Sequence, residues 1–485
     1  MTHKLNTGFV RAAAFAAALL APALAHALDT NNEFICTLVG DGAHNGTNPT
    51  SNHQPNLQLY GTDLGFSFRH RHRLVMLFGD TWVQDNAICL PPPLSDDSVG
   101  SLFLGLDNDP DDCLNLRFRT DAANGARPIR VLKGAVEQPM GALRTPITGW
   151  SDNRRAYGYF TGNNEVQCGP GNACPSDLAC GAANVCVDPT SSMPAAAAAE
   201  RHIARTPLPF GFNVHRYRIR HTFVTGKFLN ATSRAVKTFN ENSPATNDYT
   251  APTAGFGLSN GELLMWGRPA FSATVGTSAD LYLLHHPVPG LQGPSGASSW
   301  QPRYFAGLKA GQPIWSSDQA DAVPVIEDEE IGQVLQHSIA WVPSLNQFVM
   351  LYGGRLPFPF TLVPNNPNTG IQLRTAPHPW GPWSDPQLLW NATAEGAYGG
   401  CPDGTLYPAL GGGCAQTDPF RPGGLNMCPA PSPNPNLDFG VEYGVNILST
   451  FTKPGPEANS ATIYWNISTW NPYRVVLMKS TLTLP

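Results

Sequence analysis

A hairpin pattern recurs five times along the chain. Each copy has an apolar strand rich in Gly or Thr, then a short polar turn, then a second strand rich in aromatic and large aliphatic residues. The first strands of the copies are expected to begin near Tyr60, Thr145, Ala251, Gln336 and Tyr443. Repeated antiparallel units of this kind predict an all-β fold, a five-bladed β-propeller. The copies are about 85 to 105 residues apart, so long loop insertions must decorate the blades.

The alternative fold is a β-sandwich, which also contains many short antiparallel strands. A TIM barrel is disfavoured because amphipathic helical stretches do not alternate with the strands. Only residues 194–205 have a helical pattern.

The composition fits a packed, turn-rich protein. The 485 residues include 47 Gly and 46 Pro, and 42% are hydrophobic. This density of turn-forming residues argues against long helices or a coiled coil. The formal net charge is −6 and no long basic run is present, so nucleic acid is not an expected partner.

The first 27 residues have the marks of a secretory signal peptide. Lys4 and Arg11 flank an apolar run that ends in Ala-His-Ala, and cleavage is expected after Ala27. The alternative, a transmembrane anchor, would need a longer apolar run. Residues 28–485 are then expected to form one domain, secreted or periplasmic, with no membrane span.

Ten cysteines in an exported chain indicate disulfides. They are Cys36, Cys89, Cys113, Cys168, Cys174, Cys180, Cys186, Cys401, Cys414 and Cys428. The four from Cys168 to Cys186 are expected to pair among themselves in a small insertion, residues 165–190; the alternative there is a zinc site. We further expect a Cys89–Cys113 bond, one bond within the 401–428 loop, and the third cysteine of that loop paired with Cys36.

Acidic residues lie where the predicted inner strands begin, which is the mouth of a propeller channel. Asp63 is on the first inner strand, Asp80 ends its partner strand, and Glu442 precedes the fifth. Asp248, Glu329 and Glu330 stand before the third and fourth. Glycoside hydrolysis needs paired carboxylates, one to protonate the leaving oxygen and one to attack the sugar or activate water. The alternative for each acid is a structural or solvated role.

Other residues suggest binding. Trp82, Trp266 and Trp341 could stack on sugar rings, or could be blade core, as could Trp380, Trp383 and Trp465. The segment containing Asp107, Asp109, Asp111 and Asp112 resembles a calcium loop, although it lacks the Gly and Glu of an EF-hand. The run Arg69–Arg73 invites a metal or anion interpretation, with a solvated turn as the alternative. We expect no resident metal or other cofactor, calcium being the one open option.

Two pairs of motifs carry a family resemblance. They are residues 60–65 with 77–82, and residues 380–386 with 468–478. With these motifs the chain resembles the DUF4185 family over about residues 55–482. The resemblance implies a secreted five-bladed propeller related to glycoside hydrolase family 183, some of whose members are endo-D-arabinanases. It favours Asp63 and Asp80 as site residues.

One position departs from the family pattern. Relatives often have a Glu shortly before the Ser of the fourth inner strand, and this chain has Gln336. Either Glu442 supplies the acid or catalysis is lost. The leading hypothesis is therefore a secreted hydrolase of a polysaccharide, with Gln336 among the substrate-binding residues. The resemblance implies endo cleavage of an arabinan-type glycan. The alternatives are a non-catalytic propeller that binds glycan or another surface polymer, and a propeller with different chemistry, such as a lyase.

Overall fold

The computed structural model describes the chain in segments. These are residues 29–40, 59, 61–82, 96–105, 108–118, 130–133, 136–139, 146–151, 156–161, 171, 179–180, 186–187, 201–202, 219–224, 230–236, 262–268, 280–287, 303–327, 336–353, 370–391, 442–469 and 474–484. Within these segments the regular elements are β-strands and three short 3₁₀ helices, which confirms the all-β prediction.

The first predicted hairpin is confirmed. It consists of β2 (Gly61–His70) and β3 (Arg73–Trp82), and β4 (Asp96–Phe103) and β5 (Arg117–Phe118) continue the sheet in the order β2-β3-β4-β5. Only Arg71 and His72 form the turn, and Arg71 has a φ of 56°. The turn is exposed, but His70 is buried.

The second and fourth predicted hairpins are also confirmed. The second is β8 (Pro146–Ser151) with β9 (Ala156–Thr161); β13 (Ile219–Val224) lies parallel to β9, and β12 (Arg201–His202) completes that sheet. The fourth sheet has the order β20 (His337–Val342), β21 (Gln347–Gly353), β22 (Ile371–Ala376), β23 (Gln387–Trp390). Because β12 lies within residues 194–205, the helical interpretation is wrong at residues 201–202.

The third predicted hairpin is wrong in its first strand. β15 (Glu262–Arg268) pairs with β14 (Asn230–Val236) on one edge and with β16 (Leu281–Pro287) on the other. Both edges of β15 are therefore occupied, and the expected strand at 252–258 lies outside the described residues. The sheet continues through β17 (Arg303–Lys309) and β18 (Gln312–Ser316), while β19 (Pro324–Ile326) also pairs with β16.

The fifth sheet joins the two ends of the described chain. Its order is β1 (Asp29–Gly40), β27 (Arg474–Thr483), β26 (Ser460–Thr469), β24 (Glu442–Ile447), with β25 (Lys453–Pro454) beside β26. β24 and β26 confirm the fifth predicted hairpin, whereas the sequence pattern gave no sign of β1. β1, the first strand of the described chain, pairs with β27, the last, through ten register partners.

The remaining elements are small. β6 (Arg130–Lys133) pairs with β7 (Val136–Pro139), and β10 (Ala179–Cys180) pairs with β11 (Cys186–Val187). Cys180 and Cys186 are backbone register partners within the 165–190 insertion, and the pairing of its four cysteines stays a prediction. The 3₁₀ helices are η3 (Pro110–Asp112), η7 (Gln319–Asp321) and η9 (Ser449–Phe451).

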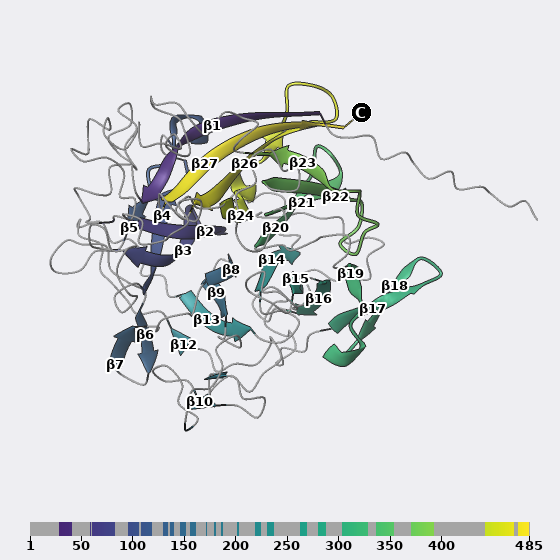
Figure 1. The fold of residues 1–485 in the computed structure, drawn as a ribbon, viewed down its shortest axis with the longest axis horizontal. Helices are drawn as coiled ribbons and strands as arrows, with labels where there is room; N and C mark the ends of the chain where they lie inside the picture. The colour runs from purple at the N-terminus through teal and green to yellow at the C-terminus, as the bar shows by residue number, and fades with distance from the viewer. Residues whose placement is uncertain are drawn as a thin grey trace, which may run out of the picture.

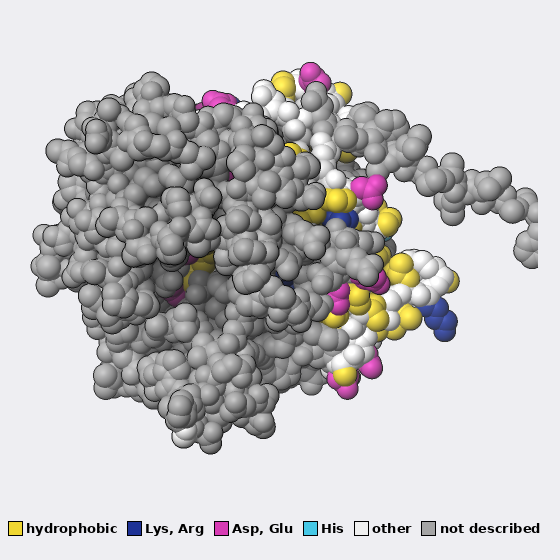
Figure 2. Space-filling view, viewed as in Figure 1, with side chains coloured by type: hydrophobic (Ala, Val, Ile, Leu, Met, Phe, Trp, Pro, Cys, Tyr) yellow, Lys and Arg dark blue, Asp and Glu magenta, His cyan; other side chains and the backbone are white. Residues whose placement is uncertain are grey.

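One strand of each large sheet contacts its counterpart in the next sheet. β2 contacts β8, β8 contacts β14, β14 contacts β20, β20 contacts β24, and β24 contacts β2. Figure 1 shows the five sheets following one another around the middle of the molecule. The β17–β18 hairpin stands at its margin in Figure 1, and Leu308 and Ile314 on these strands are exposed. Figure 2 shows hydrophobic side chains gathered on the same margin of the molecule.

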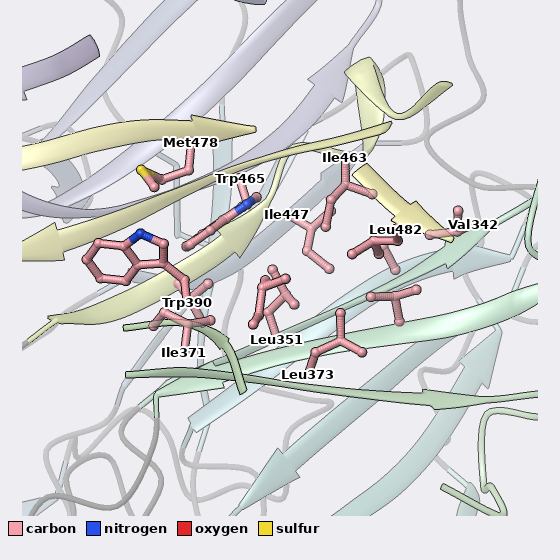
Figure 3. Close-up of a cluster of buried hydrophobic side chains, with 14 of the residues drawn as sticks. Val342, Leu351, Ile371, Leu373, Trp390, Ile447, Ile463, Trp465, Met478 and Leu482 are labelled. Carbon is pink, nitrogen blue, oxygen red and sulfur yellow. The ribbon is translucent and has the colours of Figure 1, made fainter. Parts of the chain in front are cut away.

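The hydrophobic core lies between neighbouring sheets. One cluster packs the fourth sheet against the fifth, and Figure 3 shows Trp390 and Ile371 of the fourth facing Trp465 and Met478 of the fifth. A second cluster joins the third and fourth sheets through residues such as Trp266, and a third joins the first and fifth. Burial between sheets, rather than within one, makes each sheet dependent on its neighbours.

The disulfide pattern corrects the sequence analysis. Cys36 on β1 is bonded to Cys113, which directly follows η3. The predicted Cys89–Cys113 bond and the pairing of Cys36 with the 401–428 loop are therefore wrong. Sequence spacing favoured a local partner for Cys113, but pairing with β27 places β1 in contact with η3, next to Cys113.

Candidate functional site

Asp63 lies in an irregular part of β2. The strand has register shifts between Gly61 and Asp63 and again between Leu64 and Phe66. Leu64 has a φ of 66°, which is uncommon for a residue with a side chain, and Gly65 has a φ of 82°. The irregularity separates Asp63 from the regular ladder that begins at Phe66.

Side chains of β26 support this irregular backbone. The Leu64 amide donates to Ser468 Oγ at 2.6 Å, and the Leu64 carbonyl accepts from Asn466 Nδ2 at 2.6 Å. All three residues are buried. These bonds satisfy the backbone groups that β2 cannot pair within its own sheet.

The Asp63 carboxylate receives a hydrogen bond from another sheet. The Tyr443 hydroxyl, at the start of β24, donates to Asp63 Oδ2 at 2.8 Å. The Asp63 side chain is 7% exposed, whereas Tyr443 is half-buried. A carboxylate brought from β2 and a phenol brought from β24 thus meet where both strands begin.

Gln336 ties a third strand to the same place. It directly precedes β20, is buried, and its Oε1 accepts the Gly444 N–H at 3.1 Å. Gly444 has a φ of 64°, and a Cβ on it would lie 2.9 Å from Leu64 Cδ2 and 3.0 Å from Ser468 Oγ. Only glycine fits here without displacing its neighbours, and its small size lets β24 approach β2.

Buried amides and hydroxyls continue this polar region along the strands. Asn446 Nδ2 donates to Ser67 Oγ at 3.0 Å and to Asn466 Oδ1 at 3.2 Å. The Ile447 amide donates to Ser338 Oγ at 2.9 Å. Side chains of β2, β20, β24 and β26 are therefore cross-linked by polar contacts, which hold the strand beginnings in a fixed relation.

The structure describes only some of the other predicted acidic residues. Asp80 follows Gly79, the register partner of Asp63, so its backbone lies at the same end of the first sheet. Glu442 is half-buried and precedes Tyr443 on β24. The side chains of Asp80 and Trp82 lie outside the described part of the chain, as do Asp248, Glu329 and Glu330.

Two of the predicted sugar-stacking residues are core residues. Trp266 is fully buried, its Nε1 donates to the Pro379 carbonyl at 2.7 Å, and its ring lies 5.7 Å from that of Phe348. Trp341 is 7% exposed and packs edge-to-face on the same Phe348 ring. Their burial favours the blade-core alternative over a sugar-stacking role.

Two residues of the aspartate loop make contacts within the protein. Asp109 Oδ1 accepts from the Asp111 amide and caps η3, and Asp111 forms an ion pair of 2.9 Å with Lys479. Burial pushes the pKa of Asp111 up, but hydrogen bonds from Lys479 and Tyr464 outweigh it, so the pKa is lowered. Among the described residues no group of three or more His, Cys, Asp or Glu could hold a metal ion. Asp107 lies outside them.

The Arg69–Arg73 run contains one buried histidine. His70 Nδ1 lies 2.7 Å from Ser151 Oγ of β8, so it links the first and second sheets. Burial, together with the charges of Arg71 and Arg73, lowers the pKa of His70 to about 4. The imidazole is neutral at physiological pH, and the solvated-turn interpretation holds for Arg71 and His72 only.

The sequence analysis missed the residues that complete the site. Tyr443 was recognised only as the start of a strand, and Asn446 and Asn466 were not noticed. A signal was present, because each Asn interrupts an otherwise apolar strand, in Gly-Val-Asn-Ile-Leu and Tyr-Trp-Asn-Ile. Polar residues at buried strand positions need partners. Asn446 donates to Asn466 and to Ser67, and Asn466 donates to the Leu64 carbonyl.

Residues 270–479 match the family model of DUF4185, a domain of unknown function. This part of the chain is a DUF4185 domain. The DUF4185 match contains the motifs at 380–386 and 468–478, together with Gln336, Glu442 and Tyr443. It begins after β2 and β3, so Asp63 and Asp80 lie outside it, and it is shorter than the 55–482 range of the expected resemblance. No curated protein matches the chain. Within the described residues no helix is long and apolar enough to cross a membrane.

Proposed function

We propose that this protein is an exported hydrolase that cleaves a polysaccharide, with its active centre at the beginnings of β2, β20 and β24. The observation that carries the proposal is the meeting of Asp63 with Tyr443 beside the Gln336–Gly444 contact. Side chains from three separate sheets converge there, and one of them is a nearly buried carboxylate. Substrate sites of repeat folds occur where equivalent loops and strand ends gather.

The same proposal includes a five-bladed β-propeller. Its support is the cyclic order of contacts among β2, β8, β14, β20 and β24, together with a last sheet that combines β1 with β27. A sandwich has two facing sheets, and it would not bring five strands from five sheets into such a cycle.

The carboxylates receive distinct roles in this proposal. Asp63 is the base or nucleophile, and Asp80 is the acid or a group that raises its neighbour's pKa by like-charge repulsion. Glu442 is the alternative acid, since it begins β24 beside Tyr443. The relation of the family to endo-D-arabinanases, which the resemblance implies, makes an arabinan-type glycan the first substrate to test.

A non-catalytic glycan-binding propeller is the second candidate, and Gln336 favours it. A buried amide occupies the position where an acid was expected, and an amide cannot transfer a proton as a carboxyl group does. In that case the polar groups around Asp63 would bind sugar hydroxyls without cleaving the chain.

Export is part of the proposal. It rests on the signal-peptide pattern of residues 1–27, which lie outside the described residues, and on the Cys36–Cys113 disulfide. Disulfides of this kind persist in oxidising compartments.

One experiment distinguishes the hydrolase from the non-catalytic glycan-binding protein. Purified protein is incubated with arabinan, arabinogalactan and other cell-wall glycans, and new reducing ends and bound polysaccharide are measured in parallel. A hydrolase releases reducing ends from at least one glycan. Binding without release supports the second candidate, and neither binding nor release contradicts both.

A further inference from the structure

The contact between Tyr443 and Asp63 has a geometry that orients a carboxylate. The phenol donates to one oxygen only, Oδ2, at 2.8 Å, and it approaches from β24 while Asp63 is carried by β2. The bond therefore joins two sheets through residues that are 380 positions apart in the sequence. A hydrogen bond donated to a carboxylate favours its ionised form.

The backbone around Tyr443 is built to hold it there. β24 has a register shift between Tyr443 and Asn446, and Gly444 lies within it with a φ of 64°. The Gly444 amide donates to Gln336 Oε1, and a Cβ on Gly444 would lie 2.9 Å from Leu64 Cδ2 and 3.0 Å from Ser468 Oγ. Tyr443 is therefore fixed on one side by β20 and on the other by β2 and β26.

We propose that Tyr443 is a positioning residue, held by Gln336 through Gly444, that keeps the Asp63 carboxylate ionised and oriented for reaction with a sugar. The inference rests on the proposed function for its chemistry. It gives Asp63 the role of base or nucleophile and not that of acid, because an acid must be protonated before it can act. It also gives Gln336 a reason to be an amide, since its oxygen accepts the Gly444 N–H without introducing a charge beside Asp63.

The test compares two tyrosine variants. Tyr443→Phe removes only the hydroxyl, and Tyr464→Phe is the matched control, because Tyr464 also donates to an aspartate, Asp111, at 2.8 Å. The titration of Asp63 is followed by 13C NMR of aspartate-labelled protein, its resonance being the one that Asp63→Asn removes. We expect Tyr443→Phe to raise the midpoint by about 0.5 to 1 pH unit and Tyr464→Phe to leave it unchanged.

Activity supplies a second readout. On a glycan that the parent cleaves, Tyr443→Phe is expected to move the acidic limb of the kcat/KM profile to higher pH and to lower kcat about tenfold, with little change in KM. An unchanged Asp63 midpoint in Tyr443→Phe would overturn the inference even if Asp63→Asn were inactive. A shifted midpoint in a protein that cleaves no glycan would uphold the contact and reject the proposed function.

A second variant keeps the inference testable if Tyr443→Phe does not fold. Gln336→Leu removes the acceptor of the Gly444 amide and leaves the Tyr443 hydroxyl in place. We expect a smaller shift of the Asp63 midpoint in the same direction. A midpoint identical to that of the parent would show that Gln336 does not position Tyr443.

Discussion

The Cys36–Cys113 disulfide is expected to hold β1, and with it the fifth sheet, against the first sheet. The two cysteines are 77 residues apart in sequence, and both are buried. By the loop-entropy relation, a cross-link of this length stabilises the folded chain by about 4.5 kcal/mol at 25 °C, and measured values are commonly about 2 to 4 kcal/mol. For a chain of this size, such a loss corresponds to a fall in Tm of about 2 to 5 °C.

The assay is thermal unfolding of Cys36→Ala, Cys113→Ala and the double variant under oxidising conditions. Each single variant breaks the same bond, so all three variants are expected to show nearly the same decrease in Tm relative to the parent. Hydrogen exchange should show loss of protection first in β1, because it is the edge strand of its sheet and its backbone pairs with β27 only. Effects of the two single variants that add in the double variant, or a Tm equal to that of the parent, would refute the reasoning.

Three further predictions concern single residues. The folded-state pKa of His70 is about 4, below its ordinary value of 6.5, so the unfolded chain binds more protons than the folded chain between these pH values. The contribution of His70 to the free energy of unfolding is therefore complete above pH 6.5 and falls by up to about 3 kcal/mol as the pH drops towards 4. His70→Asn should flatten this pH dependence, measured by urea unfolding at several pH values. Gly444→Ala places a methyl group 2.9 Å from Leu64 Cδ2 at a φ of 64°, so a loss of about 1 to 3 kcal/mol in the same assay is expected, and an unchanged stability would contradict the close packing. Trp266→Ala should cost about 3 to 5 kcal/mol, whereas Trp266→Phe should leave KM for any cleaved glycan unchanged; a large rise in KM would restore a sugar-binding role.

Local sequence patterns predicted the hairpins well. In β2–β3 and β20–β21 the two strands are joined by a short polar turn, so pairing partners are neighbours in sequence. β1 was missed because its partner β27 lies more than 400 residues away, and a single strand carries no mark of a distant partner. The Cys36–Cys113 bond was missed with it, because Cys36 lies on β1.

The candidate site could be predicted in its acids but not in its contacts. Asp63 stands out in the sequence because it interrupts an apolar strand. Its contact with Tyr443 depends on two backbone irregularities, at Leu64 and at Gly444, and these arise from packing between sheets. The partner strand of β15 was misplaced because β14, with the sequence Asn-Ala-Thr-Ser-Arg-Ala-Val, lacks the apolar run that marks the other copies.

The central claim is that Asp63 performs chemistry on a glycan. The most direct measurement is the rate of reducing-end release by Asp63→Asn relative to the parent, with Asp385→Asn, an exposed aspartate of the fourth sheet, as control. We predict that Asp63→Asn lowers the rate by about a hundredfold or more with a Tm near that of the parent, and that Asp385→Asn is unaffected. Cleavage by Asp63→Asn at the parental rate would contradict the account.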